Sequence, residues 1–232
     1  MKNTRILNEE IYLRLIEEEY INQLSRFEGT DKQLRNKIDD YKKDFEFKIK
    51  QIILEERREN PDYNIDIRTS AELKIGIDSG YDGTAIRLYS IEKNIDELLI
   101  ISQGSQDIQD WEYNLKSLFA GDKPLQATDT ISFISHLKKE YQLSENTHIT
   151  GLSHSLAHNN NLTAHLTYTK NDLFDEIYSV NDAQSNYYQL YFENPAFRRQ
   201  LNRHFSISLD KNEKAIYDLD PSELHDFAQE YY

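Results

Sequence analysis

Hydrophobic residues recur at helical spacing along residues 5–58, in two series separated by a break at Gly29-Thr30. The series are Ile11, Leu15, Tyr20 and Leu24, and then Leu34, Ile38, Tyr41, Phe45, Ile49 and Ile53. Thr30 or Asp31 is suited to cap the second helix, and Asn60-Pro61 is expected to stop it. Because the repeat is too short to sustain a coiled coil by itself, the pattern predicts a helical hairpin over residues 1–60. Its apolar stripe is expected to pack on the rest of the protein.

From about residue 70 the pattern changes to strands alternating with helices. Strands are predicted at 84–91, 97–102, 148–151, 176–180 and 205–209. Helices are predicted at 109–119, 129–141, 185–203 and 221–231, with one more directly after Ser155. This alternation predicts an α/β sheet covered on both faces. We expect it to form a second domain over residues 61–232.

The strand-to-helix junction within residues 149–165, ITGLSHSLAHNNNLTAH, carries the most informative chemistry. A nucleophile elbow needs a strained serine at such a junction, with small residues two positions before and after it. Around Ser155 these residues are Ser153 and Ala157, and the amide of Leu156 would donate to an oxyanion at the helix N-terminus. The same string also fits a polar helix cap, and Gly151 to Ser155 reads as G-x-S-x-S, which makes Ser153 an alternative nucleophile.

A second segment, IISQGSQD at 100–107 followed by DWEYNL at 110–115, lies about fifty residues upstream. It resembles the signature of the class 3 lipases, in which an apolar strand runs into R-G-T and then D-W-x-x-N/D-L. The stretch DSGYDGTA at 78–85 is similar to the S-G-F-D-A-T-A stretch of uncharacterised lipase-like domains of Firmicutes. The resemblance covers roughly residues 75–210. It implies an α/β-hydrolase-like, mostly parallel sheet flanked by helices.

The resemblance also implies roles for individual residues. Ser155 would attack a lipid or other carboxylic ester and form an acyl-enzyme, without a metal or organic cofactor. Ser105 would form the other half of the oxyanion hole through its backbone amide, together with Leu156. Gln103 stands where the family usually has an arginine, which is normally structural.

The family order of the triad is serine, acid and then histidine, which points to Asp210 and His225. Competing residues remain: Asp182, read as a turn residue, Asp218, Asp220, which also fits a cap of the last helix, and His204, which precedes Asp210. His225 equally fits an exposed helix position, because the family histidine usually occupies a loop after a further strand. The domain is therefore expected to be one strand short of the family pattern.

Composition and charge narrow the function classes. The chain of 232 residues has no cysteine, which excludes disulfides and thiol nucleophiles and fits a reducing compartment. Its net charge of −14 disfavours general nucleic-acid binding. The N-terminus has no apolar segment typical of a Sec signal peptide, and no stretch approaches the length of a membrane span. We therefore expect a soluble protein in the cytoplasm.

Two alternatives stay open on the sequence alone. His154, His158 and His165 share one predicted helix and could bind a metal, but no carboxylate accompanies them at ligand spacing. The chain could also be a non-catalytic interaction protein, prophage-encoded or toxin-associated, that binds a partner through its acidic surface. The N-terminal helices would then dock that partner, whereas in an enzyme they could act as a lid. The sequence gives no account of the polar run Asn159-Asn160-Asn161.

Overall fold

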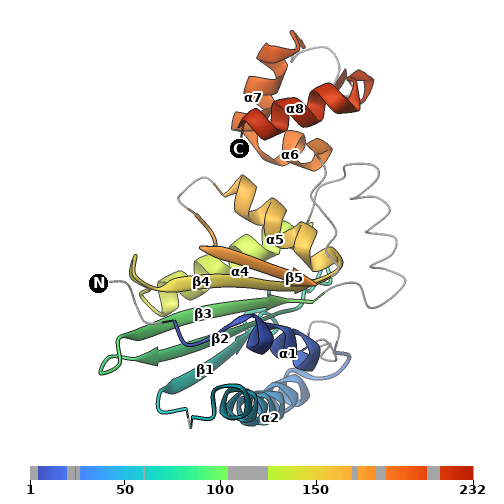
Figure 1. Ribbon diagram of the computed structural model, residues 1–232. Helices are drawn as coiled ribbons and strands as arrows, with labels where there is room; N and C mark the ends of the chain where they lie inside the picture. Colours follow the sequence, from blue (N-terminus) through green and yellow to red (C-terminus); the bar gives the residue numbers. More distant parts are fainter. Residues whose placement is uncertain are drawn as a thin grey trace.

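A computed structural model describes residues 5–19, 24, 27–59, 61–103, 125–168, 172–180, 187–207 and 215–231. Its centre is a five-stranded sheet in the order β1-β2-β3-β4-β5 (Figure 1). The strands are β1 (Asn64–Thr69), β2 (Gly83–Ser90), β3 (Ile95–Ser102), β4 (His148–His154) and β5 (Glu176–Val180). With helices on both faces, the fold belongs to the mixed α/β class.

The sheet is mixed, whereas the sequence led us to expect a mostly parallel one. β1 pairs with β2, and β2 with β3, in antiparallel orientation, while β3, β4 and β5 run parallel. The connections explain the difference. A tight turn at residues 91–94 joins β2 to β3 and permits only antiparallel pairing, whereas helices connect the parallel strands.

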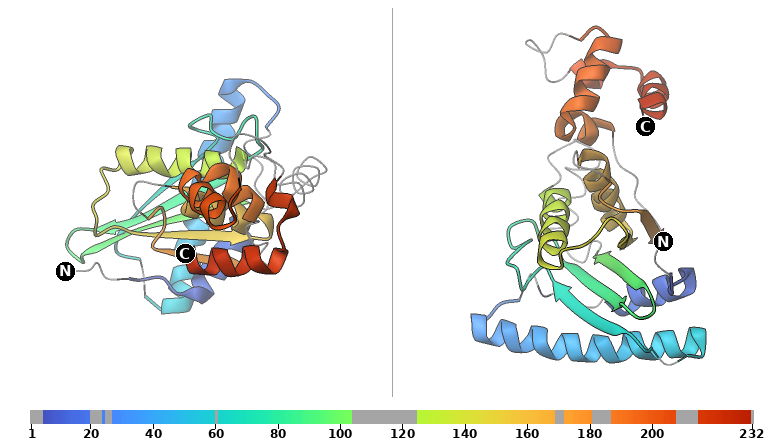
Figure 2. Two further views of the ribbon diagram at one scale, coloured as in Figure 1. Left: turned by 90° about the horizontal axis from the view of Figure 1, so that it is seen from above. Right: turned by 90° about the vertical axis from the view of Figure 1, so that its left-hand side faces the viewer.

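Two pairs of helices sandwich the sheet (Figure 2). α1 (Glu9–Glu19) and α2 (Asp31–Arg57) cover one face, and their apolar residues share one hydrophobic cluster with β2 and β3. α4 (Leu125–Glu140) and α5 (Leu156–Thr167) cover the other face in a second cluster. The capping box of α2 uses Thr30, whose side chain accepts the Gln33 amide, so Thr30 rather than Asp31 is the cap. None of the described helices combines the length and the apolar character that crossing a membrane requires.

The C-terminal helices form a third apolar cluster beyond α5 (Figure 1). They are α6 (Tyr187–Glu193), α7 (Pro195–His204), the 3-10 turn η2 (Ala215–Asp218) and α8 (Pro221–Tyr231). The Asn194 side chain joins this cluster to α5 by donating to the Leu166 carbonyl.

The strand expected at 205–209 is not formed over its described residues. Phe205 and Ser206 form a turn at the end of α7, with φ of 54° at Ser206. The alternating apolar residues Phe205 and Ile207 pack on the C-terminal helical cluster instead of on the sheet. Residues 208–209 and the helix expected at 109–119 lie outside the described residues.

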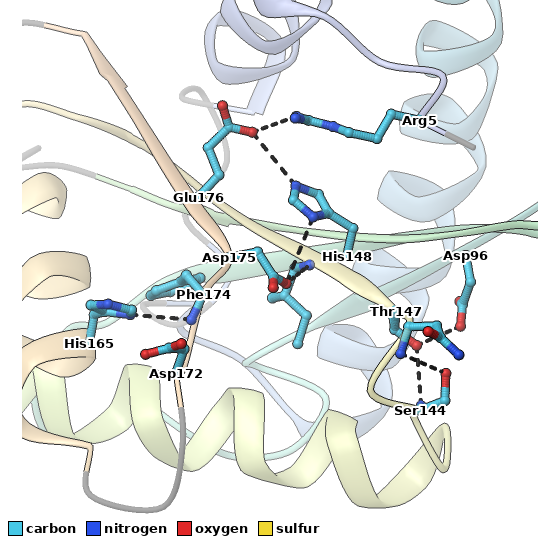
Figure 3. A network of polar contacts seen from close by, with 12 residues as sticks. Arg5, Asp96, Ser144, Thr147, His148, His165, Asp172, Phe174, Asp175 and Glu176 are labelled. Carbon is cyan, nitrogen blue, oxygen red and sulfur yellow. Dashed lines mark hydrogen bonds and ion pairs between the residues drawn. The ribbon is translucent and has the colours of Figure 1, made fainter. Parts of the chain in front are cut away.

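The segment before α1 is anchored at the N-terminal ends of the parallel strands (Figure 3). Arg5 pairs with Glu176 of β5, and the Ile6 amide donates to Glu97 of β3. His148 of β4 lies 3.7 Å from Glu176 and 3.9 Å from Asp175. This polar network holds the N-terminal edge of the sheet, and it leaves the opposite edge to the strand-to-helix junction at Ser155.

Candidate active site

The candidate site centres on Ser155, between the end of β4 and the start of α5. Ser155 has φ of 55° and ψ of −126°, a conformation that a residue with a side chain rarely adopts. Its amide donates to the Val180 carbonyl at 3.0 Å, which ties the turn to the end of β5. The Ser155 side chain makes no helix-capping hydrogen bond and is half-buried. The junction is therefore not a polar helix cap, and its geometry is that of a sharp strand–turn–helix elbow.

The residues two positions to either side of Ser155 are small and fully buried, as a tight turn requires. Ser153 and Ala157 are each 0% exposed. Ser153 lies in the sheet with Ser102 of β3 and Ser179 of β5 as its register partners. Because its side chain is enclosed, Ser153 is a poor alternative nucleophile.

Of the two oxyanion donors expected from the sequence, only Leu156 lies within the described residues. Leu156 is the first residue of α5, where a helix leaves its amide without an intrahelical partner. Ser105 lies outside the described residues, but β3 leads towards it: Ser102 is in register with Ser153, and the Gln103 amide donates to the Asp82 carbonyl. Gln103 is buried, and its side chain donates to the Glu19 carbonyl at the end of α1. The carboxyl edge of β3 is thus fixed beside the elbow.

The structure does not bring the expected histidines to Ser155. His225 is exposed on α8, and its Nδ1 lies 2.6 Å from the hydroxyl of Tyr187 on α6. His204 ends α7 and packs on the rings of Phe205 and Phe227. Over the described part of the chain, no hydrogen bond joins either histidine to Ser155.

Two of the four candidate acids lie within the described residues. Asp220 accepts hydrogen bonds from the Ser222 hydroxyl and, at 2.8 Å, from the Ser222 amide. These bonds hold the pKa of Asp220 below its usual value and cap α8, as the alternative interpretation of this residue expected. Asp218 is exposed in η2. Asp210 and Asp182 lie outside the described residues.

The asparagine run that the sequence left unexplained is buried beneath the elbow. Asn159, Asn160 and Asn161 are at most 1% exposed. Asn161 accepts a hydrogen bond from Ser102 at 2.9 Å, and Asn160 donates to Gln126 of α4 at 2.6 Å. Three successive helical residues point about 100° apart, so the run can bind several neighbouring elements at once. Sequence reasoning missed these residues, although a polar run inside an otherwise buried helix was the available signal.

A pocket of about 460 Å³ lies between the loop before β2 and the first turns of α4. Ile77 and Leu125, both of which line it, are two of the large hydrophobic residues that the structure leaves exposed. Ser79 donates to Asp129 in its wall, where burial and the neighbouring Asp78 raise the pKa of the Asp129 carboxyl. The Gln126 side chain donates to the Ser79 carbonyl, so the pocket wall connects through Gln126 to α5.

Metal binding finds no support in the described residues, where no three histidine, cysteine or acidic side chains gather closely enough to hold an ion. The Nδ1 atom of His165 accepts the Phe174 amide at 3.3 Å (Figure 3), and burial lowers the pKa of this imidazole. His165 is therefore a neutral residue that ties α5 to the segment before β5.

Comparison with known proteins places the chain in a family. Residues 11–232 match the family described as a domain of unknown function, DUF6792. The chain belongs to this family. It is also similar to the uncharacterized protein YvcB of Bacillus subtilis (strain 168), with 37% identity over 235 residues that cover 97% of this chain and 35% of the relative. The chain thus spans about a third of the length of that relative. No solved structure matches it.

Neither match names a lipase or another hydrolase. The family and the mixed α/β architecture are established, and the resemblance to class 3 lipases is not carried by these comparisons. The chemistry at Ser155 therefore depends on the geometry of the site.

Proposed function

We propose that this chain is a serine hydrolase with an α/β-hydrolase-like fold, which acts on a lipid or other carboxylic ester through an acyl-enzyme on Ser155. The observation that carries the proposal is the backbone of Ser155, which has φ of 55° between a buried parallel strand and a helix. Such strain costs about 1–3 kcal/mol and persists only where the surrounding structure enforces it, which is typical of functional sites.

In the proposed reaction the Ser155 hydroxyl oxygen forms a bond to the ester carbonyl carbon and gives its proton to a base. The amides of Leu156 and Ser105 stabilise the resulting oxyanion. The carbonyl then re-forms, the ester C–O bond breaks and the alcohol leaves with the proton. Water then adds to the acyl carbon while the base takes its proton, the bond between that carbon and the Ser155 oxygen breaks, and the proton returns to Ser155 as the acid leaves. No cofactor takes part.

By chain order we assign His225 as the base and Asp210 as the acid that orients it. In this assignment the Tyr187–His225 hydrogen bond has to be exchanged for one to Ser155. The pocket between Ile77 and Leu125 suits an apolar acyl group, because both side chains expose hydrophobic surface.

A fluorophosphonate probe tests the proposal, since it phosphonylates activated serines. We expect labelling of the wild type, no labelling of Ser155→Ala, and normal labelling of Ser153→Ala, the matched control two residues away. His225→Ala should label at least about 100-fold more slowly if His225 is the base. Wild-type rates in His225→Ala would discard that residue and leave Ser155 as the nucleophile.

The second candidate is a catalytically inactive hydrolase-like protein that binds a protein partner through its acidic surface. It is favoured by the contacts of His225 with Tyr187 and of His204 with Phe227, neither of which involves Ser155, and by the net charge of −14. The same probe distinguishes the two candidates. A folded wild type that takes up no label would contradict the hydrolase and favour the binding protein.

A further inference from the structure

The end of β3 and the elbow helix α5 are joined by a chain of buried hydrogen bonds. The Ser102 hydroxyl, at the last residue of β3, donates to Oδ1 of Asn161 at 2.9 Å. The Asn161 amide nitrogen lies 3.5 Å from the Leu152 carbonyl of β4, to which it donates. On the other side, the hydroxyls of Tyr81 and Ser102 lie 3.4 Å apart. The chain therefore runs from the loop before β2 through β3 and α5 to β4.

The three side chains of this hydrogen-bond chain, those of Tyr81, Ser102 and Asn161, are enclosed in protein. Tyr81 and Ser102 are 2% exposed and Asn161 is 0% exposed. Gly83 leaves the space that the Tyr81 hydroxyl occupies, because a Cβ atom at residue 83 would lie 2.4 Å from that oxygen. Where water is excluded, losing one hydrogen-bond partner leaves the other polar group unsatisfied. The three side chains are therefore strongly held in a single hydrogen-bonded arrangement.

These hydrogen bonds lie next to the elbow at which the proposed reaction takes place. An oxyanion hole needs its donors at fixed positions, and the proposed donor that the structure describes is the Leu156 amide at the start of α5. Asn161 lies in the second turn of α5 and is bonded to the last residue of β3. Asn161 thus fixes α5, which carries the Leu156 amide, against the ends of β3 and β4.

We propose that Asn161 is a positioning residue for the elbow, which through Ser102 holds the start of α5 and the end of β3 in the register that an oxyanion hole requires. This inference rests on the proposed function of Ser155, because it assigns Asn161 a part in the same reaction. Asn161 touches no substrate. It acts by keeping the Leu156 amide in place against the ends of β3 and β4.

The test measures two quantities in Asn161→Ala. The first is the fluorophosphonate labelling rate, separated into the binding constant and the maximal rate by varying the probe concentration. A donor displaced by about 1 Å lowers the maximal rate about 100-fold and leaves probe binding little changed. The second is hydrogen exchange at the amides of residues 155–157, which should become faster. Thr167→Ala is the matched control, because it removes a side-chain hydrogen bond to Thr163 at the far end of α5.

The two proposals fail in different ways. Labelling of Asn161→Ala at the wild-type rate, with exchange unchanged, overturns the positioning role and leaves the hydrolase standing. A wild type that takes up no label overturns the hydrolase, and unchanged exchange in the variant then overturns the positioning claim as well.

If Asn161→Ala does not fold, Asn161→Leu combined with Ser102→Ala and Tyr81→Phe replaces all three hydrogen-bonded side chains by apolar groups and is expected to restore the fold. A positioning role predicts that this triple variant is stable and slow to label. A purely structural role predicts that labelling returns together with stability.

Discussion

Glu97 offers a quantitative test of how the pKa of a buried carboxyl group affects the stability of this protein. Its side chain on β3 is fully buried, and its carboxylate accepts the Ile6 amide that anchors the N-terminal segment. Burial raises the pKa of Glu97 from 4.5 to about 7, against the opposing effects of the Ile6 hydrogen bond and of Arg5 and Arg57. The perturbation we propose is Glu97→Gln, a neutral side chain of the same shape that keeps an acceptor for Ile6.

The direction in which stability changes with pH follows from proton binding. Because the pKa of Glu97 is higher in the folded state than in the unfolded state, the folded protein binds more protons between pH 4.5 and 7. Its contribution to stability is complete below pH 4.5 and is lost as the pH rises through about 7. The full loss corresponds to about 3 kcal/mol. Glutamine resembles the protonated acid, so Glu97→Gln should match the wild type near pH 4.5 and exceed its free energy of unfolding by about 3 kcal/mol at pH 8.5.

Thermal unfolding followed by circular dichroism between pH 4.5 and 8.5 measures the effect. For a chain of this size the difference at pH 8.5 corresponds to a rise of about 6–12 °C in Tm. Glu92→Gln, which alters an exposed carboxylate at the turn before β3, is the matched control and should follow the wild type. Other buried acids such as Glu19 titrate equally in both proteins and cancel in the difference. Parallel pH profiles for wild type and Glu97→Gln would refute the reasoning.

Two further predictions concern the backbone of the site. Ser155→Gly should abolish fluorophosphonate labelling and yet raise the free energy of unfolding by about 1 kcal/mol relative to Ser155→Ala, because glycine adopts φ of 55° without strain; equal Tm values for the two variants would contradict a strained elbow. Gly83→Ala should cost about 1–3 kcal/mol in denaturant unfolding, because its methyl group would meet the Tyr81 hydroxyl. In a Tyr81→Leu background, which lacks both the hydroxyl and the ring atoms 2.7 and 2.8 Å from the added Cβ, Gly83→Ala should cost less; an equal cost would show that this contact is not the cause.

Features that depend on neighbouring residues in sequence were predictable. The last helix was expected over 221–231 and is observed as Pro221–Tyr231, because a proline at the first position and an Asp220 cap define its start locally. Thr30 caps α2 for the same kind of reason. The sharp turn at Ser155 was predictable from neighbouring residues as well, since a tight turn there requires small residues at 153 and 157 between a strand and a helix.

Other features were hidden because their partners are far away in the chain. β1 was not expected, since its sequence NIDIRT contains Asp66 and Arg68. In the folded protein Asp66 accepts the Tyr141 hydroxyl, and Arg68 pairs with Glu140. Ile65 and Ile67 alternate with these polar residues as a strand requires, but only two apolar positions carry the signal.

By itself, then, the sequence determined most of the described helices, with α6 and α7 expected as one, four of the five strands of the described sheet and the sharp turn at Ser155, because capping, periodicity and turn geometry are set within a few residues. Only the tertiary structure decided that the sheet is mixed, that Asn161 bonds to Ser102, and that His225 contacts Tyr187 and not Ser155. The two side-chain contacts join residues 59 and 38 positions apart, and they depend on how whole elements pack. A local pattern carries no information about which distant partner satisfies a buried polar group.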